Sequence, residues 1–398
     1  MFDLFNLLSL FYVFRSLQVA AAAWRERASL RQDPLTTHKK HLAEQASFFI
    51  AVPVGVFVHE FGHALAVWGS GGQVETFAYR VFWGYVVPAG QFTETQRWVI
   101  ALAGTLGSLL FGLAAWLLLR RHAAPALRYF GLRAFRFQTY FSLIYYPVFT
   151  LLGFEGDWRM IYDFGATPLW SGLTAVCHAG LLLLFWYGDR IGWFEMPAYA
   201  TPEAQVHFDA LAAEAARRPE DVGVQLQLVE TLRRGGALNR ARRHLRRVLA
   251  EHPHVGLAHL EMAILASTGK AQVPGTAVAS AKRALQLGLP NEPGAAYAHQ
   301  LLGRYHLDVG HLAQAVDHYG QAIDLARRAG AAPLQLAHLH HQRSAAYRQQ
   351  RLYDLAQRDV QTARGLAADS GDEAAVAAYD EALAVIEKQA AGKAGYSE

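Results

Sequence analysis

Long apolar stretches dominate the first half of the chain, whereas the second half alternates apolar and polar positions over short distances. Residues 47–69, 98–119 and 167–187 are each close to the roughly 20 apolar residues that a helix needs to cross a bilayer. A shorter stretch, 137–154, has the same character but is interrupted by Pro147. The pattern predicts a helical membrane body of four to five spans, followed by a soluble helical half. Residues 74–87 are rich in β-branched and aromatic residues, which favours a short β-hairpin beside the spans.

The apolar start of the chain, residues 1–24, contains Arg15 near its middle. This segment fits a first span, an interfacial helix or an uncleaved signal-anchor. The linker at 189–203 is rich in aromatic residues, which suit a membrane surface. The expected domains are an N-terminal hydrophobic segment with its basic loop, a membrane domain, this linker, a helical repeat domain and a tail. Their boundaries are 1–46, 47–188, 189–203, 204–390 and 391–398.

Basic residues are concentrated in two of the predicted loops. Residues 24–46 and 120–136 carry 10 Lys and Arg between them, whereas residues 70–97 and 154–167 carry three. The positive-inside rule therefore places the first two loops in the cytoplasm. The same count places everything after Asp189 in the cytoplasm. We expect an integral membrane protein of a bacterial inner membrane with a cytoplasmic second half.

Four alanines mark a repeat in the second half. Ala241, Ala277, Ala315 and Ala356 are separated by 36, 38 and 41 residues, and a turn glycine such as Gly310 precedes them. Small residues at this spacing, each followed by a bulky residue one turn later, are typical of stacked helical hairpins. This half resembles the tetratricopeptide repeat, with a generic helical bundle as the alternative. Such arrays bind a protein partner and are not usually catalytic.

Charge and cysteine content exclude some functions. The formal net charge of +4 is too small to indicate a nucleic acid partner. The single cysteine, Cys177, excludes an internal disulfide framework.

The strongest chemical signal is the sequence His59-Glu60-Phe61-Gly62-His63. Between residues 47 and 69, the only ionisable side chains are His59, Glu60 and His63, and such groups are costly within a bilayer. Four residues apart on a helix, the two histidines face the same side and can bind one zinc ion. Glu60 lies close enough to act as a general base toward water.

A catalytic zinc site needs a third protein ligand at a similar membrane depth. Asp157 can reach the two histidines only if the chain folds back after the span at 137–154. Gly153 and Gly156 permit such a turn. Glu155 and Asp163 are competing ligands. Asp157 could instead cap the next helix or pair with Arg159, and the spacing alone does not decide between these roles.

We expect different roles for His178 and for the histidines of the second half. His178 lies inside the span at 167–187, and we expect a neighbouring helix to satisfy it, although it could border the site or gate water. The histidines of the second half do not form a convincing ligand set and are expected at the surface. They include His252, His254, His338, His340 and His341.

The region around the histidine motif resembles the site-2 protease family of intramembrane zinc metallopeptidases. The resemblance covers roughly residues 47–188 and includes the glycine-rich stretch Ala103-Gly104-Thr105-Leu106-Gly107-Ser108 on the following span. It implies that Asp157, in Gly156-Asp157-Trp158, is the third zinc ligand. The family usually carries Asn-Pro upstream of this aspartate, and this chain has Tyr146-Pro147 instead.

Two hypotheses follow from these patterns. In the first, the protein is a zinc metalloendopeptidase that cleaves transmembrane segments of substrates in the lipid bilayer, while the repeat domain recruits or regulates. His59, His63 and Asp157 would then hold the metal, and Glu60 would be catalytic. In the second, the protein is an inactive membrane-anchored scaffold whose repeats bind a partner. The intact histidine motif favours the first hypothesis, and the missing asparagine favours the second.

Overall fold

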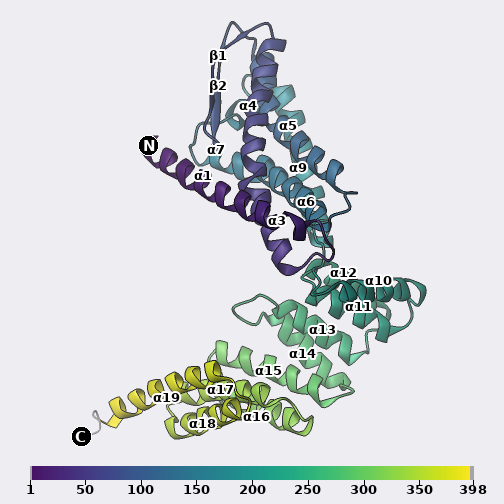
Figure 1. Cartoon of the computed structure of the whole chain (residues 1–398), viewed down its shortest axis with the longest axis vertical. Coiled ribbons are helices and arrows are strands. Elements are labelled where there is room, and N and C mark those ends of the chain that lie inside the picture. Colours follow the sequence, from purple (N-terminus) through teal and green to yellow (C-terminus); the bar gives the residue numbers. More distant parts are fainter. Residues whose placement is uncertain (1, 395–398) are drawn as a thin grey trace. The chain divides into compact units, whose positions relative to one another are not determined.

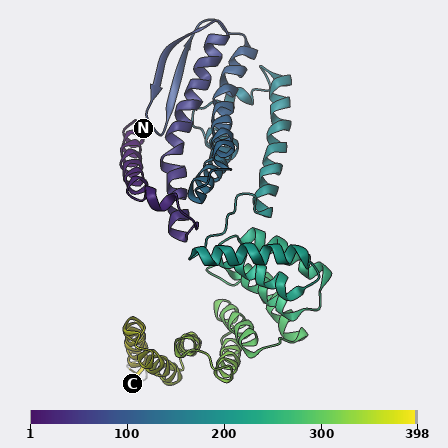
Figure 2. The same ribbon diagram turned by 45° about the vertical axis from the view of Figure 1, so that its right-hand side comes forward.

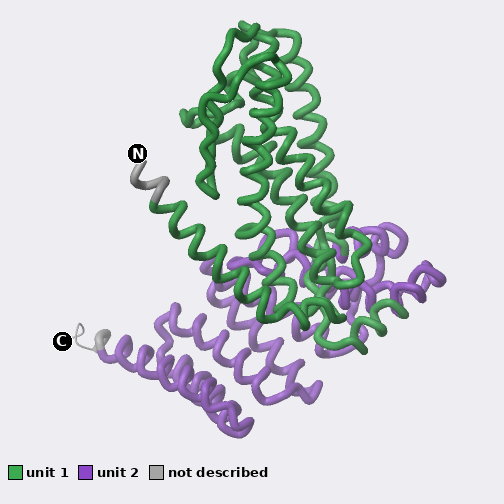
Figure 3. Tube along the Cα trace, turned by 45° about the horizontal axis from the view of Figure 1, so that its top comes forward, with its two compact units in different colours: residues 1–210, 234–240 green, residues 211–233, 241–398 purple. Residues whose placement is uncertain are grey.

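The computed structural model describes residues 2–394, which divide into two compact units (Figure 3). Unit 1 comprises residues 1–210 and 234–240, and unit 2 comprises residues 211–233 and 241–398. Apart from one two-stranded hairpin, the regular structure of the described residues is helical (Figure 1). The predicted fold class, an all-α membrane helical bundle followed by a helical domain, is confirmed. The finer domain boundaries stay a prediction.

Unit 1 contains the long apolar helices. Its elements are α1 (Phe2–Arg25), α2 (Arg27–Leu30), α3 (Thr37–Phe49), α4 (Ala51–Gly69), β1 (Gln73–Tyr79), β2 (Gly84–Ala89), α5 (Glu94–Leu119), α6 (Pro125–Tyr140), the π-helix η1 (Phe141–Tyr145), α7 (Tyr146–Leu151), α8 (Trp158–Ile161) and α9 (Pro168–Ile191). Four helical stretches among the described residues are long and apolar enough to cross a membrane. They are Leu7–Arg25, Thr37–Gly69, Glu94–Leu119 and Pro168–Ile191.

The predicted span at 137–154 is not one uninterrupted apolar helix. It is divided among the end of α6, the π-turn η1 and the short helix α7, which has Pro147 in its first turn. Proline suits a first turn because its missing N–H has no partner there. Helix α7 stops at Leu151, so the following loop can turn back toward α4. The helix is therefore interrupted near Pro147, as expected, and this stretch is not among the four helical stretches of the described residues that are long and apolar enough to cross a membrane.

Glycines bring α4 and α5 into close contact. A Cβ atom on Gly62 would lie 2.6 Å from the Ala103 carbonyl oxygen, and one on Gly107 would lie 2.8 Å from the Val58 carbonyl oxygen. Both distances are too short for any side chain, so these glycines allow the two backbones to touch. Small residues serve the same purpose in other membrane helix pairs. The pairing fixes the histidines of α4 against α5.

The predicted hairpin forms beside α4, with β1 and β2 antiparallel (Figure 2). The Tyr79 hydroxyl donates a hydrogen bond to the Pro53 carbonyl oxygen at 3.0 Å, which ties the hairpin to α4. At the other end of the connection, Gly84 begins β2 directly against the Glu60 side chain. A Cβ atom on Gly84 would lie 2.6 Å from Glu60 Cγ. The hairpin therefore covers one side of the histidine motif.

Unit 2 and the helices that lead into it form successive helical hairpins. Within this region α13 packs on α14, α15 on α16, α17 on α18, and α18 on α19. The repeat alanines Ala241, Ala277, Ala315 and Ala356 all lie in the first turn of a second helix, and each is 0% exposed. The helices are α10 (Pro202–Arg217), α11 (Val222–Arg234), α12 (Leu238–Glu251), α13 (Gly256–Ser267), α14 (Gly275–Leu287), α15 (Glu292–Asp308), α16 (Leu312–Arg328), α17 (Pro333–Gln349), α18 (Tyr353–Asp369) and α19 (Glu373–Ala394).

Helix α19 continues to Ala394, and the rest of the tail predicted for 391–398 lies outside the described residues. One expectation about the histidines of the second half needs correction. His340 is buried rather than at the surface, because its Nδ1 atom lies 2.8 Å from Asp359 Oδ1 on the next helix. Arg343 donates two hydrogen bonds of 2.7 Å to the same carboxylate.

Candidate metal centre

Two imidazoles and one carboxylate converge at the side of α4 that faces α5. Asp157 Oδ2 lies 3.0 Å from His59 Nε2 and 3.2 Å from His63 Nε2. The side chains of His59, His63 and Asp157 are 14%, 9% and 15% exposed. Among residues 2–394, these three form a group whose potential ligand atoms all lie within 4.8 Å of one another. The structure therefore brings together the three residues expected to hold a metal.

The histidine rings are oriented by their other nitrogen atoms. His63 Nδ1 lies 2.7 Å from the Ile100 carbonyl oxygen, which can only accept, so Nδ1 carries the hydrogen. His59 Nδ1 lies 3.2 Å from Ser108 Oγ, a hydroxyl that can accept in the same way. Both Nε2 atoms are then free to present a lone pair toward Asp157. Histidine ligands of metals are commonly held by such contacts.

Gly104 keeps the approach to both Nε2 atoms free of a side chain. Gly104 of α5 faces the imidazoles, and a Cβ atom there would lie 2.3 Å from His63 Nε2 and 2.7 Å from His59 Nε2. Any larger residue would occupy the space in front of both lone pairs. The donor set of two imidazoles and one carboxylate is also one that zinc uses in catalytic sites, where a fourth position stays open. By both tests, these residues fit a zinc ion.

Glu60 lies beside the cluster without joining the group of three. Its side chain is 5% exposed and rests against Gly84 of the hairpin. It is close enough to His59, His63 and Asp157 to interact with them electrostatically. A carboxylate in this position can exchange a proton with a molecule bound at the cluster.

The loop after α7 carries Asp157 back to the histidines. Gly153 adopts a φ of 101°, a backbone conformation that favours glycine, and α8 begins at Trp158. The Tyr146 hydroxyl lies 3.0 Å from Asp157 Oδ2 and 3.1 Å from the Asp157 backbone nitrogen. The predicted fold-back thus occurs at the glycine expected to permit it, and a tyrosine fixes its end.

The other acidic candidates do not reach the histidines, and Asp157 does not take the alternative roles considered for it. Glu155 is exposed, and Asp163 accepts hydrogen bonds from the Gly165 and Ala166 backbone nitrogens. The Asp157 side chain makes no capping hydrogen bond to α8. Arg159 donates to the Gly153 carbonyl oxygen. Of the acidic residues considered from the sequence, only Asp157 faces the histidines.

His178 is satisfied by neighbouring elements. Its Nε2–H donates to the Leu143 carbonyl oxygen in η1 at 2.6 Å, and Tyr162 hydrogen-bonds to Nδ1. Its ring also packs against Trp158, with a centroid separation of 4.7 Å. His178 therefore holds α8 in place, next to Asp157, instead of belonging to the group of three.

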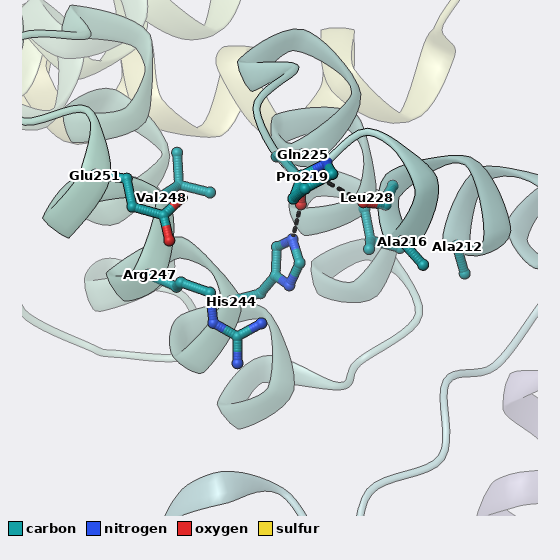
Figure 4. A pocket seen from close by; sticks show the side chains of 10 residues that line it. Ala212, Ala216, Pro219, Gln225, Leu228, His244, Arg247, Val248 and Glu251 are labelled. Atoms are coloured by element: carbon teal, nitrogen blue, oxygen red, sulfur yellow. Dashed lines mark hydrogen bonds between the residues drawn. The ribbon is translucent and has the colours of Figure 1, made fainter.

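A cavity of about 280 Å³ lies within unit 2 (Figure 4). Its polar side chains are Gln225, His244, Arg247 and Glu251, set among alanine, leucine, valine and proline. His244 hydrogen-bonds to Gln225, whose amide nitrogen donates to the Ala215 and Arg218 carbonyl oxygens. Gln225 thus joins His244 of α12 to the backbone at the end of α10.

Sequence reasoning missed two contributors to the centre. Tyr146 was noted only as a departure from a family pattern, and its contact with Asp157 depends on the path of the loop. Ser108 enters the sequence analysis only as the end of the glycine-rich stretch 103–108. A hydroxyl within an apolar span was the available signal, because such groups seek a partner within the membrane.

Part of the chain matches a known family model. No curated protein matches the chain. The family model described as Peptidase M50B-like, of the site-2 protease family, matches residues 44–156, which include both histidines, Glu60 and the start of the loop that leads to Asp157. Together with the four apolar helices, this similarity supports an integral membrane protein and, at the level of the family, an intramembrane metalloprotease.

Proposed function

We propose that the chain is an intramembrane zinc metalloprotease that hydrolyses peptide bonds in transmembrane segments of other proteins. The observation that carries this proposal is the convergence of His59 Nε2, His63 Nε2 and Asp157 Oδ2, with Glu60 buried beside them. His59, His63 and Asp157 would hold the ion. When bound, zinc supplies Lewis-acid polarisation and makes water a stronger nucleophile near neutral pH.

Glu60 is the proton carrier in this mechanism. Its carboxylate takes a proton from the attacking water while the new carbon–oxygen bond forms at the scissile carbonyl. It then delivers that proton to the amide nitrogen as the carbon–nitrogen bond breaks. Gly84 lies directly against the Glu60 side chain, so the hairpin restricts how this carboxylate can move. The reaction adds one water and leaves the residue unchanged.

The hairpin also suggests how a substrate is held. A transmembrane helix hides its backbone, so it must unwind locally before hydrolysis. Strands β1 and β2 pair only with each other among the described residues, and an unwound segment could add to their free edge. Phe77 and Tyr79 of β1 pack edge-on against Phe57 of α4, which holds the hairpin beside the centre.

The repeat half is proposed to recruit or regulate through a protein partner. Its support is the tetratricopeptide-like spacing of four fully buried alanines and the stacking of consecutive helical hairpins. The excess of basic residues in residues 24–46 and 120–136 favours a cytoplasmic location for this half. A bacterial inner membrane is the setting that we propose.

The decisive experiment compares the intact protein with Glu60→Gln. Each is co-expressed with candidate single-span membrane proteins, and cleavage is followed by immunoblot. We expect the glutamine variant to retain zinc, because Glu60 is not a ligand, and to lose cleavage by about 10²–10⁴-fold, the usual contribution of general acid–base catalysis. Undiminished cleavage by the variant would remove Glu60 from the mechanism.

Metal analysis of the purified protein distinguishes the scaffold alternative. An enzyme of this type should contain about one zinc per chain with an open coordination position. A scaffold with a vestigial centre should contain no stoichiometric zinc, and a structural site should have four protein ligands.

A further inference from the structure

Tyr146 is placed to control the aspartate of the candidate centre. It is the first residue of α7, immediately after the π-turn η1. Its ring stacks on Phe141 with a centroid separation of 6.3 Å and meets His59 edge-on at 5.6 Å. It also packs against the buried cluster that contains Trp158 and Ile161. The ring is therefore held on several sides before its hydroxyl makes any bond.

The two hydrogen bonds of that hydroxyl have defined directions. A backbone N–H can only donate, so the hydroxyl oxygen accepts from the Asp157 N–H at 3.1 Å. Its single hydrogen is then directed to Asp157 Oδ2 at 3.0 Å. This is the same oxygen atom that faces both imidazoles. One side chain thus fixes both the backbone and the carboxylate of Asp157.

The neighbouring glycine makes this contact close. A Cβ atom on Gly156 would lie 3.0 Å from Tyr146 Cε2, 3.1 Å from its hydroxyl oxygen and 2.8 Å from Thr150 Oγ1. The absence of a side chain at position 156 lets the loop lie directly on the tyrosine ring. The loop, glycine and hydroxyl together set where the carboxylate points.

We propose that Tyr146 is a positioning residue that orients Asp157 for metal binding. This inference rests on the proposed function, because it requires that Asp157 is a ligand. Carboxylates that bind a metal are commonly held by a hydrogen bond from a second residue, and loss of such a partner typically weakens metal affinity or activity by 10–100-fold. In this chain, the partner is the Tyr146 hydroxyl, 3.0 Å from Asp157 Oδ2.

The test uses the purified full-length protein and measures metal directly. Zn²⁺ affinity is determined by competition with a chelator, and Co²⁺ is used as a spectroscopic probe of the ligand field. We expect Tyr146→Phe, which keeps the ring and removes the hydroxyl, to bind Zn²⁺ about 10–100-fold more weakly and to shift the Co²⁺ absorption bands. Tyr145→Phe is the matched control, because Tyr145 is 50% exposed and, among the described residues, hydrogen-bonds to none of the three ligands.

Two further variants separate the possible failures. If the proposed centre is correct, the Asp157→Asn variant should lose Zn²⁺. If this variant binds Zn²⁺ as tightly as the natural chain, the proposed function itself is overturned. If Asp157→Asn loses metal but Tyr146→Phe matches the natural chain in affinity and Co²⁺ spectrum, only the role of Tyr146 is overturned. Equal losses in Tyr146→Phe and Tyr145→Phe would also overturn that role.

Gly156→Ala provides an independent route if Tyr146→Phe does not accumulate. It keeps the hydroxyl but inserts a methyl group into the contact with Tyr146 and Thr150. We expect weaker Zn²⁺ binding and an altered Co²⁺ spectrum, because the loop must move away from the tyrosine. Unchanged values in this variant would overturn the proposal.

Discussion

Each half of the molecule buries an aspartate next to histidine, but the two aspartates are satisfied in different ways. In unit 2, Asp359 accepts two hydrogen bonds of 2.7 Å from Arg343 and contacts His340 at 2.8 Å. In unit 1, Asp157 contacts two imidazoles and a tyrosine hydroxyl, and among the described residues neither Lys nor Arg hydrogen-bonds to its side chain. A guanidinium supplies the positive charge in the first case. In the second case, a bound cation would supply it.

This difference explains why a buried His–Asp contact does not by itself indicate a metal site. The Arg343 guanidinium matches the geometry of a carboxylate and is always charged, so it occupies the position that a metal would need. Around Asp157, the corresponding space faces Gly104 and two lone pairs. The first arrangement stabilises a helix pair, and the second leaves room for chemistry.

The largest effect is expected from removing the charge partner in unit 2. Arg343→Met leaves Asp359 buried, 5% exposed, without its guanidinium, and breaking a buried ion pair in this way costs about 3–5 kcal/mol. Hydrogen exchange of α17 and α18 in the full-length protein should report that loss. Zinc content should be unchanged.

Arg364→Met is the matched control for this prediction. Arg364 pairs with Asp380, and both side chains are about half exposed, so the expected cost is below about 1 kcal/mol. Equal exchange in the two variants would mean that the Asp359 network contributes no more than a surface ion pair.

The next effect concerns the space in unit 1. Gly104→Ala places a methyl group within 2.3 Å of His63 Nε2 unless the helices separate, so we expect Zn²⁺ affinity to fall by at least about 100-fold, or about 2.7 kcal/mol. Chelator competition on the purified protein measures this change. The repeat half should keep its hydrogen-exchange protection.

Gly180→Ala is the control for Gly104→Ala, because it makes the same substitution in an apolar helix where nothing lies within 4 Å. Full zinc affinity in Gly104→Ala would show that the space is not where the ion binds. The comparison between the two buried aspartates would then lose its basis.

The sequence predicts best the features that depend on local periodicity. His59 and His63 share a face because they are four residues apart, and Ala241 and Ala315 are buried because small residues are needed where helices cross. These predictions need only the helical repeat. They hold whatever path the chain takes elsewhere.

Features that depend on long-range register were harder to predict. The π-turn η1 accommodates an additional residue in a helical turn, so it changes the direction in which Tyr146 points relative to α6. His340 and Asp359 are 19 residues apart in the sequence and lie on the consecutive helices α17 and α18. The sequence gives no sign of which histidine lies where these helices meet. Both contacts follow from tertiary packing.

The smallest predicted effect is a pH dependence confined to unit 2. Burial, together with the nearby His299, His306 and Lys282, lowers the pKa of His318 to about 4, although Asp317 acts in the opposite direction. His318 Nδ1 also lies 3.0 Å from His299 Nδ1, a contact in which one nitrogen must accept. Because the folded pKa lies below the usual value of about 6.5, folding favours the neutral ring.

The sign of this effect follows from proton binding. Above pH 6.5 the stabilisation is complete, and as the pH falls from 6.5 toward 4 the unfolded chain binds a proton that the folded chain does not. Allowing for the partial exposure of His318, we expect a loss of about 1 kcal/mol, seen as faster hydrogen exchange in α15 and α16. His318→Gln should flatten this dependence, whereas His254→Gln, at an exposed histidine, should not. If the pH profile of hydrogen exchange in His318→Gln matched that of the natural chain, His318 would not be the group responsible. The predicted difference between the two halves in their response to acid would then lose its support.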